Sequence, residues 1–184
     1  MGIDPDPKAV ASAHKSGLSV NQGGLPRTGL QYRQFDAVTL SHVIEHVHDP
    51  VVALREVHRI LKPGGRVWMA TPNMDSTSHR MFHRHWLHLD LPRHLVIFNA
   101  SSLKLACEHG GFINAVLQRL PSGTALCFLA SLRIMQGQGP TKVNKGDLLP
   151  WKLKWRARWT DLRATLMPEL GEELFVIATK PQEG

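Results

Sequence analysis

Four ionisable side chains have types that suit acid–base or metal chemistry. His42, Glu45 and His46 are separated by three and one positions, so they share one face if this segment is helical. On that face they could converge on a divalent ion, and His94, far along the chain, could complete the ligand set. A bound ion would lower the pKa of an acceptor group and align it for reaction.

The same residues also allow chemistry without a metal, and this is the simpler interpretation. Glu45 and His46 would then shape a pocket through hydrogen bonds. His42 or His46 would serve as a general base, because imidazole titrates near neutral pH. A transfer that needs only alignment and desolvation of its reactants requires no base at all. In each case we expect His46 and His94 to face the reacting end of the site.

The surrounding sequence alternates between strands and capped helices. This order predicts an α/β fold with a largely parallel sheet covered on both faces. In such sheets ligands bind at the carboxyl ends of the strands, where Asp4, Ser41 and His42 are expected.

The first expected helix begins at Pro7 with Asp6 as its cap and stops at Gly17. The second begins in the same way at Asp49–Pro50 and runs to Leu61, and the third runs from Asn99 or Ser101 to His109. The expected strands cover residues 35–40, 66–71, 112–117 and 174–179.

A histidine-rich segment covers residues 79–94. Its five histidines are irregularly spaced, and the segment contains no cysteine, which argues against a metal-binding tract. We predict a polar, mobile segment over the site, with His85–Trp86 and Arg93–His94 facing the substrate. Its arginines would suit an anionic or phosphorylated acceptor, or lie on solvated surface; they are Arg80, Arg84 and Arg93.

A basic, tryptophan-rich segment covers residues 142–158. Trp151, Trp155 and Trp159 recur every four residues, with Lys and Arg between them. On a helix they form one stripe, which three interpretations fit: a lid that contacts a membrane surface or a lipid substrate, a stripe facing the core, or a nucleic-acid surface. The last is disfavoured because no nucleic-acid module accompanies it.

Composition limits the classes of protein that this chain can represent. Its 184 residues carry 22 Lys and Arg against 15 Asp and Glu, a formal net charge of +7, and 42% are hydrophobic. This excludes a disordered or collagenous chain and predicts one globular domain. No apolar run is long enough to span a bilayer and no signal peptide precedes the domain, so we expect a cytoplasmic protein, with peripheral membrane association as an extension. Cys107 and Cys127 are expected to be reduced core thiols.

Several short motifs together carry a family resemblance. The motifs are GIDP at 2–5, FDAV at 35–38, SHVIEHV at 41–47, DP at 49–50, LKPGG at 61–65, TPN at 71–73, HW at 85–86, PRHL at 92–95, Phe98 and GGF at 110–112. Over roughly residues 1–117 they resemble class I S-adenosylmethionine-dependent methyltransferases, and the later ones resemble a bacterial subgroup acting on small molecules or cell-envelope precursors.

The resemblance implies a Rossmann-like sheet, mostly parallel with an antiparallel last strand, and S-adenosylmethionine as cofactor. It also implies that Asp4, with Pro5, holds the ribose, that Gly24 and Leu25 lie beside the adenine, and that Ser41 and His42 line the methionine end. A single domain is expected over residues 1–184, with a variable helical insert or lid at 120–170. The histidine and glutamate set resembles the metal sites of small-RNA 2′-O-methyltransferases and ubiquinone-pathway O-methyltransferases.

One part of the family pattern is missing. The glycine-rich turn of the family should precede Asp4 by about twenty residues, whereas three residues precede it here. We therefore expect a chain truncated at its N-terminus, without the first strand and first helix, with Met1 an internal methionine and two inner strand edges exposed. Asn21 and Gln22 also stand where family members often carry an acidic residue for the adenine amino group.

The expected function follows from the resemblance. We expect methyl transfer from S-adenosylmethionine to an oxygen or nitrogen of a small-molecule or lipid-linked acceptor. The alternative is a catalytically incompetent fragment that acts as a dimerising, membrane-binding or anion-binding module, with a homodimer as a further expectation.

Overall fold

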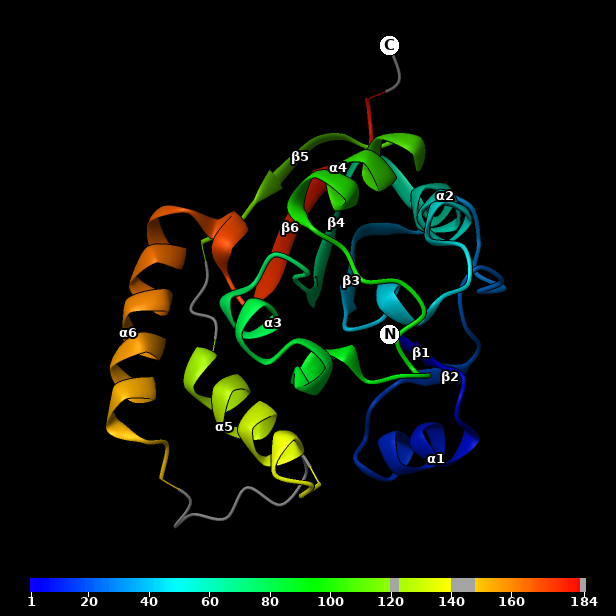
Figure 1. The fold of residues 1–184 in the computed structure, drawn as a ribbon. Coiled ribbons are helices and arrows are strands. Elements are labelled where there is room, and N and C mark those ends of the chain that lie inside the picture. Colours follow the sequence, from blue (N-terminus) through cyan, green and yellow to red (C-terminus); the bar gives the residue numbers. More distant parts are fainter. Residues whose placement is uncertain (120–122, 140–147, 183–184) are drawn as a thin grey trace.

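The strands form two separate sheets in the computed structural model, which describes residues 1–119, 123–139 and 148–182. A small sheet pairs β1 (Gly2–Asp4) in parallel with β2 (Val20–Gln22). The main sheet has the order β3-β4-β6-β5, in which β3 and β4 are parallel and β6 is antiparallel to both neighbours (Figure 1). Its strands are β3 (Phe35–Ser41), β4 (Leu61–Pro72), β5 (Ile113–Leu117) and β6 (Glu173–Thr179). The predicted α/β sheet with an antiparallel last strand is confirmed.

Helices α2 (Pro50–Ile60) and α4 (Ala100–His109) cover one face of the main sheet. Alternate residues of β6 are fully buried against them, as expected for a strand with one face toward a core. The expectation that both faces are covered is wrong for the described residues. Trp68, Phe175 and Ile177, on the other face, are only partly buried.

Polar side chains cap the helices where the sequence predicted caps. Asp6, Asp49 and Asn99 accept backbone N–H bonds at the first turns of α1 (Pro7–Lys15), α2 and α4. Such a bond satisfies one of the free N–H groups at a helix N-terminus. The predicted helices are confirmed, except that β4 already begins at Leu61, which was expected to end α2.

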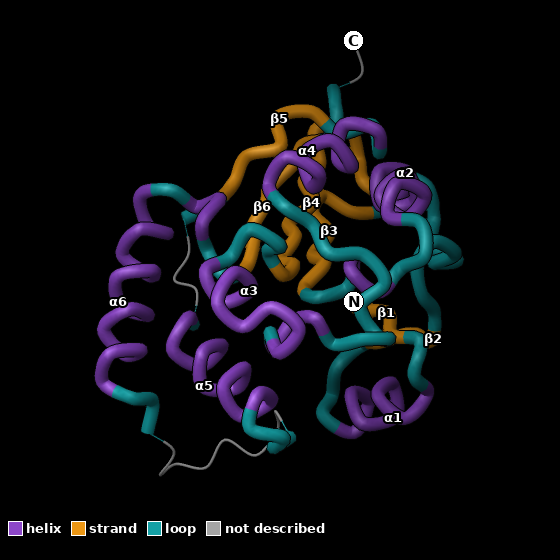
Figure 2. The backbone as a smooth tube through the Cα atoms, in the orientation of Figure 1, coloured by secondary structure: helices purple, strands orange, loops and turns teal. Residues whose placement is uncertain are grey.

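A second hydrophobic core lies beside the main sheet, among the helices labelled α3, α5 and α6 (Figures 1 and 2). These are α3 (Thr77–Phe82), α5 (Thr124–Met135) and α6 (Trp151–Leu166). Phe82, Trp86 and Phe128 are buried in this core. The expectation that Trp86 faces the substrate from a polar, mobile segment is therefore wrong, because its indole fills space against α5.

The segment between α3 and α4 contains two short 3-10 turns, η2 (His83–His85) and η3 (Leu87–Leu89). Two further turns are η1 (Ile44–His46) and η4 (Pro168–Leu170). Helices α5 and α6 occupy the described part of the expected insert at 120–170, whose residues 120–122 and 140–147 lie outside the described residues, as do residues 142–147 of the basic segment.

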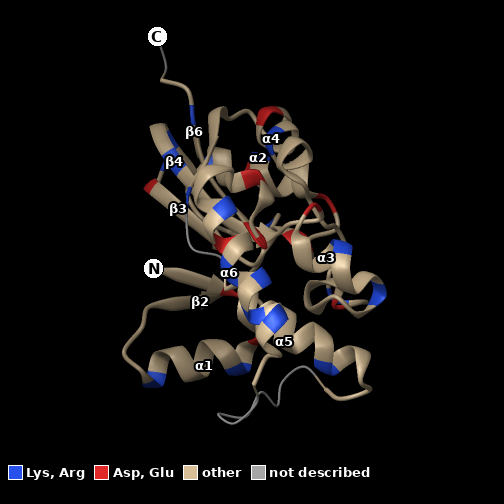
Figure 3. Cartoon of the chain, turned by 60° about the vertical axis from the view of Figure 1, so that its left-hand side comes forward, with Lys and Arg blue, Asp and Glu red and all other residues tan. Residues whose placement is uncertain are grey.

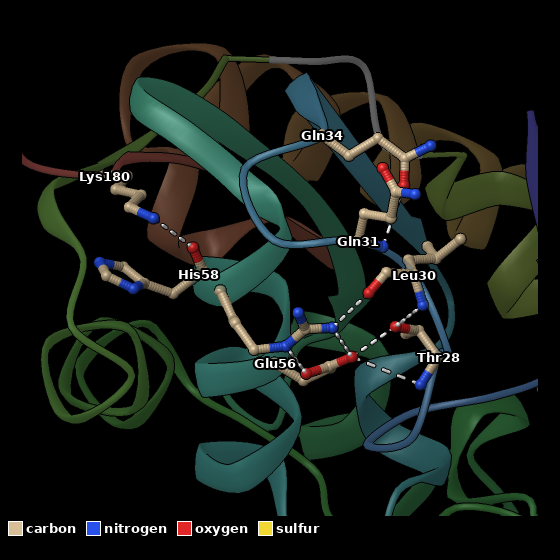
Figure 4. A network of polar contacts seen from close by, with 8 residues as sticks. Thr28, Leu30, Gln31, Gln34, Glu56, His58 and Lys180 are labelled. Carbon is tan, nitrogen blue, oxygen red and sulfur yellow. Dashed lines mark hydrogen bonds and ion pairs between the residues drawn. The ribbon is translucent and has the colours of Figure 1, made fainter.

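A polar network fastens the loop between β2 and β3 to helix α2 (Figure 4). The Glu56 carboxylate accepts hydrogen bonds from Thr28 and Arg59, and Arg59 Nη2 also donates to the Leu30 carbonyl at 2.6 Å. Lys180 Nζ donates to the carbonyls of His58 and Leu61, both at 2.8 Å. The end of α2 thus holds both the loop after β2 and the chain after β6.

Both cysteines are buried and free, as predicted. Burial raises the pKa of Cys107 and of Cys127 to about 12. Across residues 1–119, 123–139 and 148–182, no helix has the length and apolar character to cross a membrane.

Candidate functional site

The site begins where β3 ends. His42 follows Ser41, and its backbone N–H donates to the Ala70 carbonyl of β4 at 2.9 Å. Its φ of 52° lies in the left-handed region, so the chain turns sharply out of the sheet. Turn η1 (Ile44–His46) comes next and contains Glu45 and His46, close to the end of β3. The four residues from His42 do not form a continuous helix, which changes how their side chains meet.

Glu45 is fully buried, and both oxygens of its carboxylate are hydrogen-bonded. Its Oε1 lies 3.2 Å from Nδ1 of His42, and its Oε2 accepts from the Thr71 hydroxyl at 3.1 Å. Burial pushes the pKa of Glu45 up, but the contact with His42, a backbone hydrogen bond of its own residue and the Thr71 hydroxyl together outweigh burial and hold that pKa below its ordinary value. Glu45 is therefore a buried carboxylate that stays ionised at neutral pH.

His42 is held by acids on both sides of its ring. Besides Glu45, the carboxylate of Glu173 lies 3.5 Å from its Nε2. The hydrogen bond to Glu45, aided by the charge of Glu173, raises the pKa of His42 above its ordinary value although burial opposes this. The ring also stacks near His88, with 6.4 Å between the centroids.

His46 and His94 have their ring orientation fixed by backbone carbonyls. Nδ1 of His46 lies 2.9 Å from the Arg93 carbonyl, and Nδ1 of His94 lies 2.7 Å from the His88 carbonyl. A carbonyl oxygen can only accept, so each Nδ1 carries the proton and donates it. Each Nε2 of the neutral ring is then left with a lone pair. The two rings meet edge to face, with 4.7 Å between their centroids.

Three of the four predicted metal ligands come together. Glu45, His46 and His94 each offer one ligand atom, and these atoms lie within 4.8 Å of one another. His42 is not part of this group, because the turn after β3 directs it toward Glu45 Oε1 and Glu173 instead. The expected four-residue set is thus a three-residue set with His42 beside it.

Three residues of the site were not predicted from the sequence: Thr71, His88 and Glu173. Thr71 ends a predicted strand, so its position at the carboxyl edge was a usable signal. Glu173 reaches the site because β6 runs antiparallel to β4 and pairs it with Pro72. Burial, together with the nearby charge of His42, lowers the pKa of His88 to about 4, so this ring is neutral.

The predicted cofactor residues fall into two groups. Asp4, Pro5 and Gly24 are neighbours, because Gly23 N donates to the Asp4 carbonyl at 3.1 Å and a Cβ on Gly24 would lie 3.8 Å from Cβ of Pro5. Leu25 packs against the main core. Ser41 and His42 lie at the end of β3, on the other sheet.

Asp4 has one carboxylate oxygen engaged, since Oδ1 accepts from the N–H of Asp6 at 2.8 Å. Its Oδ2 has no partner among the described residues, which suits acceptance from a ribose hydroxyl. Two of the three predicted acceptor-binding arginines are paired with acids, whereas Arg84 Nε lies 3.4 Å from Nε2 of His85. Arg80 lies 3.7 Å from Asp75, and Arg93 lies 3.1 Å from Asp90.

Comparisons with known proteins extend this picture. A family described as "Methyltransferase domain" matches residues 1–115. The chain is similar to a protein named ubiquinone biosynthesis O-methyltransferase from Pseudomonas syringae pv. tomato, with 42% identity over 79 residues, which is 39% of this chain and 34% of that protein. The chain therefore spans about a third of the length of that relative.

Solved structures share the fold at low sequence identity. One is a SAM-dependent methyltransferase from Archaeoglobus fulgidus, with a TM-score of 0.61 and 17% identity, covering 97% of this chain and 75% of that one. Another is the Haemonchus contortus phosphoethanolamine N-methyltransferase 2 in complex with S-adenosyl-L-methionine. Its TM-score is 0.59 at 16% identity, covering 98% of this chain and 43% of that one.

Proposed function

The chain belongs to the methyltransferase domain family, and from this premise we propose that it transfers a methyl group from S-adenosylmethionine to a hydroxyl oxygen of a small-molecule or lipid-linked acceptor. The cofactor present in a structure of the same fold supports the methyl donor. The name of the Pseudomonas syringae relative supports oxygen as the atom methylated.

The observation that carries the choice of oxygen is the pair of Nε2 atoms on His46 and His94, which have no hydrogen-bond partner among the described residues. A hydroxyl must lose its proton as it attacks the methyl group, whereas a neutral amine attacks through a lone pair that it already has. Two imidazole nitrogens with lone pairs beside a buried carboxylate can take up that proton, and the N–H formed in this way can then donate to the developing oxyanion.

His42 suits a positioning role better than that of a base. Its raised pKa favours the protonated form, and each ring nitrogen faces an acid. A protonated imidazole cannot accept a proton from the acceptor. The His42–Glu45 contact instead fixes the turn that orients His46, so we assign proton removal to His46 or His94.

The two groups of predicted cofactor residues, one around Asp4 and one at the end of β3, fit a bound cofactor. S-adenosylmethionine supplies an electrophilic methyl group on a positively charged sulfur. Asp4 would accept hydrogen bonds from the ribose through its free Oδ2. Gly24 and Leu25 would lie along the adenine, and Ser41 with His42 along the methionine end. Binding in this form aligns the two reactants, which alone accounts for a large part of many rate enhancements.

A divalent ion fits the same three acceptor-side residues. Two imidazole nitrogens and one carboxylate oxygen form a common ligand set for Zn²⁺ and similar ions. Both imidazoles donate their other N–H to a carbonyl, the arrangement usual for histidine ligands. An ion held by Glu45, His46 and His94 would lower the pKa of the acceptor hydroxyl.

Methyl transfer from labelled S-adenosylmethionine to catechol and to aniline tests the proposal. We expect catechol to be methylated and aniline to remain unmodified. The double variant His46→Ala/His94→Ala should lower the rate with catechol by at least about a hundredfold, the usual range for loss of general acid–base groups. The matched control is His48→Ala, because His48 is exposed on the same segment. Methylation of aniline alone, or full activity of the double variant, would contradict the proposal.

Chelation separates the metal and metal-free forms of the proposal. If an ion is part of the site, treatment with EDTA should abolish turnover and added Zn²⁺ or Mg²⁺ should restore it in the parent chain and in His48→Ala. Turnover that is indifferent to EDTA would remove the ion and leave His46 or His94 as the base.

A further inference from the structure

Helix α6 has two opposite apolar faces. Its inner face, where Ala157, Thr160 and Ala164 are buried, packs against α5. The other face carries large side chains spaced by four, four, three and four positions, which places them on one continuous stripe. The stripe consists of Trp151, Trp155, Trp159, Leu162 and Leu166.

This tryptophan stripe is open to solvent. Trp151 is 69% exposed, and Trp155 and Trp159 are each 63% exposed. The interpretation as a core-facing stripe is therefore wrong: the small residues on the opposite side face the protein. Nothing in the described part of the chain covers the stripe, which runs for roughly 24 Å at 1.5 Å per residue. An exposed apolar surface of this extent usually marks an interaction site.

Cations line both sides of the tryptophan stripe. At 100° per residue, three of them lie along one side and two along the other. Lys152 lies 5.8 Å from the ring centre of Trp151, and Arg158 lies 5.7 Å from that of Trp155. Figure 3 shows Lys and Arg along α6, which comes forward in that view. The cations are Lys152, Arg156 and Arg163 on one side, and Lys154 and Arg158 on the other.

The only acid of this helix points away from the stripe. Asp161 accepts a hydrogen bond from the Thr124 hydroxyl of α5, so it lies toward the protein. The outward half of α6 therefore presents apolar rings and positive charge without a counter-charge from the same helix.

We propose that α6 lies in the surface of an anionic phospholipid bilayer, with the tryptophan stripe at the boundary between headgroups and acyl chains. Tryptophan favours that boundary because its ring is apolar while its N–H is polar. Lys and Arg beside the stripe can keep their stems along the apolar region and extend their charges to lipid phosphates. The proposal concerns the outer face of α6 and does not rest on methyl transfer.

The positive charge beside the tryptophan stripe helps to distinguish a bilayer from two other possible partners, a second copy of this chain and a nucleic acid. Pairing of two copies through this face would bring two rows of cations together, which repel each other. A nucleic acid would match the charge, but Leu162 and Leu166 continue the stripe with side chains that offer no aromatic face for stacking on bases. An anionic bilayer matches both the charge and the whole apolar stripe.

Flotation of the full chain with vesicles tests the proposal. We expect binding to vesicles of phosphatidylcholine mixed with phosphatidylglycerol, and little binding to phosphatidylcholine alone. Trp155→Ala/Trp159→Ala should weaken binding by about tenfold or more, because less apolar side-chain area is then buried in the bilayer. Lys154→Gln/Arg158→Gln should weaken binding about thirtyfold, because each of the two cations contributes to the binding free energy near an anionic surface. All four side chains are exposed, so these variants should keep the fold, which circular dichroism checks.

The matched control is Lys8→Gln/Lys15→Gln, which removes the same charge from exposed positions on α1. An equal loss in this control would show that net charge, not α6, drives binding, and would overturn the proposal. Unchanged binding in the tryptophan variant would overturn it as well. So would a dimer in solution that the tryptophan variant dissociates, or tighter binding to a single-stranded oligonucleotide than to the anionic vesicles.

Discussion

At the scale of single residues, the hydrogen-bonding role of each histidine in the site follows from what its ring contacts. His46 and His94 donate Nδ1–H to carbonyls, whereas His42 meets two carboxylates. Three rings of one residue type therefore have different chemistry: two offer an Nε2 lone pair, and the pKa of the third is raised by the acids beside it. This division is the physical basis for assigning different roles to them.

Removing the charge of Glu45 should lower the pKa of His42. In Glu45→Gln the largest cause of the raised pKa disappears while burial, which lowers it, remains. Titration of the His42 ring followed by NMR should therefore show a pKa that falls relative to the parent chain. Glu108→Gln, on the exposed side of α4, is the control and should leave the titration in place. An unchanged His42 pKa in Glu45→Gln would contradict the contact described.

The same pair gives a stability window in pH. The raised pKa of His42 means that its contribution to stability is present at low pH and is lost as pH rises through the folded-state pKa. The lowered pKa of Glu45 means that its contribution is present at higher pH and is lost as pH falls through its folded-state pKa. The pair therefore stabilises the fold between those two values, and Glu45→Gln should reduce the change of stability with pH at both edges of this window.

The sequence predicted which residues of the site carry chemistry better than it predicted their geometry. Glu45, His46 and His94 were singled out and do converge. His42 was expected to join them, but that depended on a helical turn, and the positive φ at His42 directs its ring elsewhere. Thr71 and Glu173 come from other strands, so their proximity depends on sheet register, which spacing along the chain does not contain.

At the scale of elements, the sequence predicted where helices begin but not which of their faces are buried. Asp49 followed by Pro50 specifies a helix start through local bonds alone, and α2 begins there. The four-residue period of tryptophans specified a stripe but not what covers it, so the core-facing interpretation of α6 was wrong. The five histidines of residues 79–94 led to the prediction of a polar segment, but Trp86 and Leu87 of this segment pack in the second hydrophobic core.

Replacing Glu172 by Gln should stabilise the fold at neutral pH. Glu172 is buried beside the start of α3, where its Oε1 accepts the Ser78 N–H at 3.2 Å, and burial raises its pKa. A carboxyl with a raised folded-state pKa favours the folded state only at low pH, and this advantage is lost as pH rises. Glutamine keeps an acceptor oxygen without a buried charge.

Thermal unfolding at pH 7 and at pH 4 measures this effect. The melting temperature of Glu172→Gln should exceed that of the parent chain by a few degrees at pH 7, with a smaller difference at pH 4. Glu169→Gln, an exposed neighbour, is the control and should change neither value. A lower melting temperature of Glu172→Gln at pH 7 would show that the ionised carboxylate is needed.

At the scale of the whole molecule, the two sheets divide the expected cofactor residues between them. Asp4, Pro5 and Gly24 belong to the β1–β2 unit, while Ser41 and His42 end a strand of the main sheet. The resemblance predicted two unpaired inner edges, and in the described residues β1 and β3 each have one neighbouring strand. Packing of Leu25 against the main core and the network at Glu56 connect the parts.

Calorimetric titration of S-adenosylhomocysteine into the purified chain tests the central claim most directly, because cofactor binding needs both groups of residues at once. The account predicts saturable binding, weakened by about 2–4 kcal/mol in Asp4→Ala, the value of one or two charge-assisted hydrogen bonds. Asp36→Ala, an exposed acid on β3 that pairs with Lys62, is the control and should bind as the parent does. No binding by the folded parent chain, or equal binding by Asp4→Ala, would contradict the account.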